Sequence, residues 1–98
     1  MAKTKMKFPN SVLYYRQRMG FTQEQVASLV GLRSDRALRD LETGKRFPRS
    51  ITILKLGAVL RVPVEFLYRD TYHSLREEMR AREEAMPKTR QGVLPLPL

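Results

Sequence analysis

The sequence has no cysteine and no tryptophan, and its only histidine is His73. The lack of cysteine excludes disulfides and thiolate metal sites. No segment approaches the run of about 18 apolar residues that a membrane span requires. The N-terminal stretch MAKTKMKFPN contains lysines but not the apolar core of a secretory signal. We therefore expect a cytoplasmic protein that does not associate with membranes.

The same shortages argue against catalysis. A metal site, or a nucleophile paired with a cysteine or histidine, would depend on His73 alone. The carboxylates at 77, 78, 83 and 84 alternate with arginines, a pattern typical of a solubilising helix face. We expect no catalytic residue, no metal and no cofactor, and hence no enzyme.

Positive charge is abundant in this chain of 98 residues, which has 19 Lys and Arg against 10 Asp and Glu, a net charge of +9. Residues 1–70 carry 14 of these cations and 6 of the anions, so they hold +8 of the excess. A chain of this length forms one small domain. A basic domain attracts DNA, RNA and anionic lipid alike, so charge alone does not choose among them.

Apolar residues at helical spacing predict an all-α fold. The first helix covers about residues 11–19 and ends at Gly20. Thr22 and Gln25 form a capping box for a second helix from Gln23 to about Val30. The side chains that we expect this helix to bury are those of Val26, Leu29 and Val30.

Further start and stop signals place the remaining helices. Ser34 is a good N-cap for a third helix that ends at Glu42 or Thr43, before a left-handed Gly44. A fourth helix covers about residues 50–60. A short turn begun by Pro63 completes the core with Val62, Phe66 and Leu67.

The third helix presents an unusual outward face. At 100° per residue, Arg36 lies about 160° from Leu38 and almost opposite the stripe that Leu38 and Leu41 form. Guanidinium groups fit guanine O6 and N7, and Asp can accept from cytosine N4, so this face suits the major groove. A solvated face with Arg36–Asp40 and Asp35–Arg39 pairs is the alternative.

Two runs of residues favour the DNA-binding interpretation of this face. FTQEQVASLVGL closely resembles the Cro and lambda-type repressor family of helix-turn-helix proteins, also called the xenobiotic-response-element family, and LRDLETGKRFP resembles the end of its third helix. The resemblance covers about residues 12–67. It implies a five-helix lambda-repressor-like domain, here residues 10–69, in which the third helix enters the major groove.

The resemblance also implies roles for individual residues. Arg16 and Glu42 match a structural ion pair between the first and third helices. The base-reading candidates are Arg33, Asp35, Arg36, Arg39 and Asp40. The phosphate-binding candidates are Gln23, Ser34, Thr43, Lys45, Arg46 and Arg49. The chain holds one residue more than the family pattern, most simply in the turn at 32–34; if it lengthens the helix instead, the contacts shift and Arg33 matters more.

The remaining segments are an arm and a C-terminal extension. Residues 1–9 are expected to form a flexible basic arm. An additional helix over 70–87, with Ser74 and Glu77 as a second capping box, places Tyr72, Leu75, Met79 and Met86 on one side. This stripe packs on its own domain or on a second copy. The tail 88–98 is expected to be extended or disordered, and it is a candidate contact for a protein partner.

These features lead to a functional hypothesis. We expect a bacterial or phage-encoded, nucleoid-associated regulator that binds double-stranded DNA, and specifically a homodimeric repressor of a partly palindromic operator. One alternative is the antitoxin of a toxin-antitoxin pair that represses its own promoter, with the toxin bound through the C-terminal helix or tail. Another is an interaction module that keeps the fold without reading DNA. The operator sequence and the regulated gene are not encoded in any of these patterns.

Overall fold

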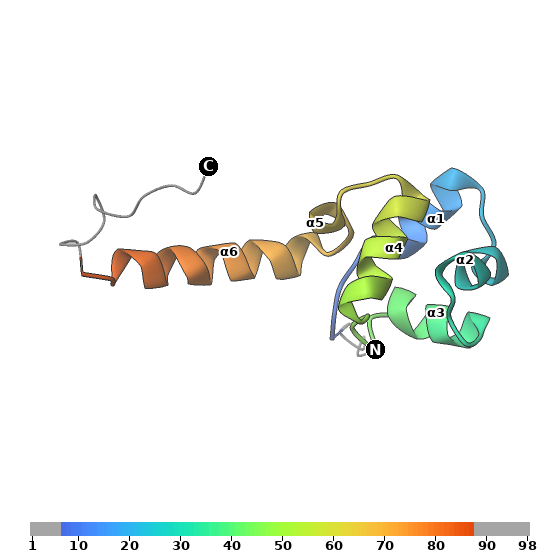
Figure 1. Cartoon of the computed structure of the whole chain (residues 1–98), viewed down its shortest axis with the longest axis horizontal. Coiled ribbons are helices and arrows are strands. Elements are labelled where there is room, and N and C mark those ends of the chain that lie inside the picture. The colour runs from blue at the N-terminus through green and yellow to red at the C-terminus, as the bar shows by residue number, and fades with distance from the viewer. Residues whose placement is uncertain (1–6, 88–98) are drawn as a thin grey trace, which may run out of the picture.

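The fold is all-α, as predicted from the sequence. The computed structural model describes residues 7–87, and the predicted tail at 88–98 and most of the predicted arm lie outside this range. Within these residues there are six helices: α1 (Val12–Met19), α2 (Gln23–Val30), α3 (Asp35–Glu42), α4 (Ser50–Leu60), α5 (Val64–Leu67) and α6 (Arg69–Glu84). Helices α1 to α5 pack into one body, and α6 projects away from it (Figure 1).

The helix boundaries follow the local chemistry of the sequence. The side chain of Thr22 accepts from the Gln25 amide at 3.0 Å, and the Gln25 side chain accepts from the Thr22 amide at 2.9 Å, which completes the predicted capping box. Gly31 ends α2 with a left-handed φ of 76°. Arg61 ends α4 with a φ of 58°, so a non-glycine residue takes the left-handed cap.

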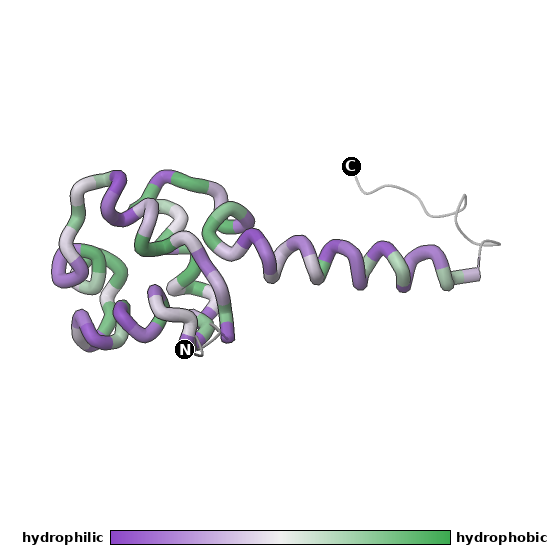
Figure 2. Tube along the Cα trace, turned by 180° about the vertical axis from the view of Figure 1, so that it is seen from behind, coloured by the Kyte–Doolittle hydropathy of each residue, from purple (hydrophilic) through white to green (hydrophobic). Residues whose placement is uncertain are grey.

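The core lies where α1, α2, α3 and α4 meet, and α5 closes it. Its fully buried side chains come from each of these helices: Val12, Val26, Leu38, Leu56 and Leu67. Green, apolar stretches of the trace converge in this body, while α6 is mostly purple (Figure 2). Apolar burial therefore fixes the positions of the first five helices relative to one another.

Two residues that the sequence pattern assigned to the core are exposed. Leu29 is 58% exposed, because the inward face of α2 is centred between Val26 and Ala27 and turns Leu29 towards solvent. Phe66 is 44% exposed and lies 5.2 Å from the Arg69 guanidinium, which covers its ring. The burial predictions for Leu29 and Phe66 were wrong.

The start of the last helix also differs from the prediction. Helix α6 begins at Arg69, directly after Tyr68, so α5 and α6 are almost continuous. Ser74 then lies inside the helix and cannot cap it, so the predicted capping box with Glu77 was wrong. The reason is that the chain leaves helical geometry at Tyr68, where φ is −123° and ψ is 58°, and the new helix starts directly after it. The helix has therefore already begun before Ser74.

Part of the predicted flexible arm is docked on the domain. The Phe8 amide donates to the Gly44 carbonyl at 3.0 Å, and the Phe8 ring packs against Phe47 with centroids 5.4 Å apart. Phe8 and Pro9 are half-buried, whereas Lys7 is exposed. For these two residues the prediction of a flexible arm was wrong, because the Phe8 ring packs against Phe47 and the core.

Candidate nucleic-acid interface

Helix α3 is anchored by its apolar side and exposes its charged side. Leu38 is fully buried and Leu41 is 5% exposed, while Asp35, Arg36 and Arg39 are all exposed. The helix lies at one edge of the domain (Figure 1). Two buried leucines therefore hold a helix whose guanidinium groups face outward.

The start of α3 fixes the register of these side chains. Ser34 is the N-cap, and its hydroxyl oxygen accepts from the Ala37 amide at 3.3 Å. Residues 31–34 form the turn before it, and the Leu32 side chain packs on the core. The turn thus has four residues and α3 starts at Asp35. This register leaves Arg36 on the side of α3 opposite Leu38 and Leu41.

A groove runs along α3 beside the loop that follows it. Its volume is about 800 Å³. The turn, α3, the loop 46–49 and the start of α4 all contribute to its walls. The charged side chains that line it are Arg33, Arg36, Asp40, Arg46 and Arg49. Four cations against one anion make this groove electropositive, which favours a polyanion such as a phosphate backbone.

Asp40 ties the loop to the helix. Its backbone carbonyl accepts from the amides of Lys45 and Arg46 at 2.9 and 3.3 Å. Its carboxylate oxygen lies 3.9 Å from the Arg46 Nε, and the Asp40 side chain is only 22% exposed. Asp40 therefore organises the loop, and its carboxylate is less free to read a base than those of fully exposed residues.

Arg16 and Glu42 join α1 to α3 in a buried ion pair, as the resemblance implied. Arg16 donates to Glu42 through Nε, and through Nη2 at 3.3 Å. Arg16 Nη1 also donates to the Phe21 carbonyl at 2.9 Å. Both side chains are nearly inaccessible, at 11% and 3% exposure. The pair fixes α3 against the scaffold through several charge-assisted hydrogen bonds.

The candidates for phosphate contact differ in how free their donors are. Gln23 Nε2 donates to Glu42 Oε1 at 2.8 Å, which leaves one amide hydrogen for a ligand. The Thr43 hydroxyl donates to the Arg39 carbonyl at 2.9 Å, so its hydrogen is already used. The Ser34 hydroxyl accepts as a cap and keeps its hydrogen free. Lys45, Arg46 and Arg49 are exposed beside the groove.

Asn10 positions α3 and was not singled out from the sequence. Its Nδ2 donates to the Leu41 carbonyl at 2.8 Å and to the Phe8 carbonyl at 2.9 Å, while its Oδ1 accepts from the Val12 amide at 3.0 Å. The signal that could have found it is its place directly before the first helix, where Asn often caps. Asn10 thus links the start of α1 to the end of α3.

The fold and the exposed helix agree with the comparison to known families. A family model described as helix-turn-helix matches residues 12–67. The chain belongs to the helix-turn-helix family. Its Cro and lambda-repressor-like character, predicted from TQEQVA and LETGKR, is confirmed. No curated protein matched the chain in a sequence search.

Family membership fixes the general role of this interface. The helix-turn-helix chain is a DNA-binding transcription regulator of the xenobiotic-response-element type. No helix within residues 7–87 combines the length and apolar character needed to cross a membrane. In helix-turn-helix proteins of this type the second helix of the motif lies in the major groove. That helix corresponds to α3 in this chain.

Proposed function

We propose that this helix-turn-helix protein is a repressor that binds a partly palindromic operator as a homodimer. The observation that carries the proposal is the outward face of α3, where Arg36 and Arg39 are exposed opposite two buried leucines. A planar guanidinium group forms two parallel hydrogen bonds with guanine, which gives sequence discrimination.

The groove beside α3 supplies the second half of the proposal. Arg46 and Arg49 line it, and Lys45 lies in the same exposed loop. We assign these cations to the sugar-phosphate backbone, where they add affinity that does not depend on sequence. Arg36 then reads bases while the loop holds the strand beside it.

Repression follows from occupancy alone in this proposal. Proteins of this type bind two half-sites about one helical turn of DNA, or a multiple of it, apart, so a symmetric dimer matches a palindromic operator. A dimer bound in this way across a promoter blocks access to it. No cofactor or ligand takes part in the proposed mechanism.

Binding to duplex at two salt concentrations tests the proposal. If the protein neutralises about 6 to 10 phosphates, its affinity falls by roughly 10³ to 10⁵ between 50 and 200 mM salt. Selection of bound duplexes from a random library then yields a motif with two related half-sites. Weak binding at both salt concentrations, with no motif after selection, would instead identify an interaction module on the same fold.

A matched pair of variants separates a local phosphate contact from an effect of net charge. Lys45→Ala weakens binding to all sequences alike and lowers the salt slope by about 1, because it removes one phosphate contact. Arg18→Ala, an equal loss of charge at an exposed position of α1 that does not line the groove, leaves DNA binding unchanged. An equal effect of both substitutions would show that only net charge matters.

A further inference from the structure

Helix α6 carries an apolar stripe that nothing in the described residues covers. It spans 16 residues, or about 24 Å, and none of them is buried. Tyr72, Leu75 and Met79 of α6 are between 42 and 50% exposed, and Met86, two residues past the end of the helix, is 56% exposed. A helix with such a stripe normally packs against a partner, since the isolated helix gains little from its own propensity.

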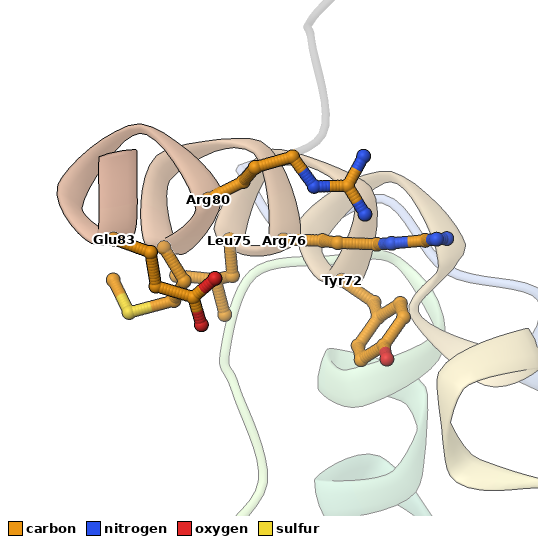
Figure 3. Close-up of a pocket in the computed structure, with 6 residues that line it drawn as sticks. Tyr72, Leu75, Arg76, Arg80 and Glu83 are labelled. Carbon is orange, nitrogen blue, oxygen red and sulfur yellow. The ribbon is translucent and has the colours of Figure 1, made fainter. Parts of the chain in front are cut away.

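The stripe is flanked by charges of a definite order. Leu75, Met79 and Tyr72 fall within a sector of about 60° at 100° per residue, and Met86 follows two residues after the helix ends. Arg76 and Glu83 border this sector on one side, where they line a shallow groove of about 290 Å³ with Tyr72, Leu75, Met79 and Arg80 (Figure 3). Glu78 and Arg82 border it on the other side and bind each other at 2.7 Å.

We propose that α6 pairs in antiparallel orientation with α6 of a second copy, with the twofold axis near Met79. The proposal rests on the homodimer proposed above and adds its interface and direction. In this arrangement the Arg76 and Glu83 flanks of the two copies face each other. The midpoint between Arg76 and Glu83 lies next to Met79, so each Arg76 meets Glu83 of the second copy.

The apolar residues obey the same symmetry. Tyr72 and Met86 lie at equal distances along the chain from Met79, so each Tyr72 packs on Met86 of the second copy. The parallel orientation is worse, because it places Glu83 beside Glu78 of the second copy, and like charges at these flanking positions are unfavourable. A stripe that complements itself about a twofold axis identifies a second copy as its partner.

The size of the stripe sets the strength of the pairing. A helix about 24 Å long and about 12 Å wide offers a footprint of roughly 300 Å², well below the ~800 Å² per partner of a stable interface. The pairing is therefore weak in free protein and is strengthened when one duplex holds two copies at high effective concentration. The two α6 helices then begin about 30 Å apart on opposite sides of the axis.

Cysteine cross-linking tests the direction, and the cysteine-free chain makes it clean. We expect Met79→Cys to form a disulfide-linked dimer, because the axis brings the two Cys side chains together. Tyr72→Cys alone does not cross-link, since its two copies lie about 21 Å apart. A mixture of Tyr72→Cys with Met86→Cys does. Glu84→Cys, on the opposite side of α6, serves as the matched control.

Charge reversal provides a second, independent readout. Glu83→Arg and Arg76→Glu each place like charges across the axis, and each weakens self-association by about three- to fivefold in sedimentation equilibrium. The double variant restores the wild-type association. Glu84→Arg leaves it unchanged, and circular dichroism checks that each variant keeps its helices.

Each outcome decides the proposal. Self-cross-linking of Tyr72→Cys, or tighter association of Glu83→Arg, would establish the parallel orientation and overturn it. Cross-linking of Met79→Cys no greater than that of Glu84→Cys would show that the stripe does not pair with itself. These measurements need no DNA, so a dimer of the expected geometry that binds no duplex would refute the proposed function alone.

Discussion

Replacement of Glu42 probes the contact that holds α3 against the scaffold. Glu42 is 6% exposed and accepts hydrogen bonds from Arg16 in α1 and from Gln23 in α2. Glu42→Ala leaves the Arg16 guanidinium buried without a counter-charge. Breaking a buried ion pair in this way costs about 3 to 5 kcal/mol of unfolding free energy. Small domains have only about 5 to 15 kcal/mol in total, so the loss is severe.

The size of the effect sets the assay. At about 4 °C or more per kcal/mol for a domain of this length, the melting temperature of Glu42→Ala falls by at least about 12 °C. Urea unfolding followed by circular dichroism measures the free energy directly. The reduction in midpoint should come without a change in slope, because the fold is the same.

A double variant separates the cost of an unpaired buried charge from the other contributions to the loss of unfolding free energy. Arg16→Met with Glu42→Leu removes both charges together, so no uncompensated ion remains, and we expect it to be clearly more stable than Glu42→Ala. It still loses the bonds to the Phe21 carbonyl and to Gln23. A loss below about 1 kcal/mol for Glu42→Ala, or equal losses for the single and double variants, would show that an uncompensated Arg16 charge is not the source of the destabilisation.

Three further predictions concern the scaffold. Burial raises the pKa of Tyr68 from 10.0 to about 12, so the free energy of unfolding should fall between pH 10 and 12, where only the unfolded state loses this proton. Tyr68→Phe should flatten that decline in urea titrations. An unchanged pH profile of this variant would exclude Tyr68 as the source of the decline. Ser34→Ala should cost about 0.5 to 2 kcal/mol through the lost cap, and Ser34→Asp should not. Arg61→Gly should gain up to about 1 kcal/mol by relieving the left-handed φ, and a loss in the same assay would contradict this account.

The sequence was most informative where local chemistry and periodicity agree. The capping box at Thr22, the glycine after α2 and the paired leucines of α3 each depend on neighbouring residues, so they define helices without knowledge of the tertiary fold. The resemblance added the Arg16–Glu42 contact, which joins residues 26 positions apart. Spacing along one helix cannot predict such a contact.

The errors come from tertiary packing. Leu29 is apolar and suitably spaced, but α2 rotates so that the smaller Ala27 faces the core. Phe8 lies in a basic segment without periodicity, and only the position of Phe47 reveals its binding site. Ser74 looks like a cap because the sequence does not show that α6 has already begun at Arg69. The ion pair between the Asp40 carboxylate and Arg46 likewise depends on how the loop after α3 folds back onto the helix, which spacing in the sequence does not show.

We propose that α3 reads base edges through Arg36. The most direct measurement compares Arg36→Ala with Arg46→Ala on the selected operator and on random duplex at the same salt concentration. We predict that Arg36→Ala lowers the specificity ratio by about 1 to 3 kcal/mol per half-site, while Arg46→Ala weakens both duplexes alike and leaves the ratio unchanged. An unchanged ratio for Arg36→Ala would contradict the account.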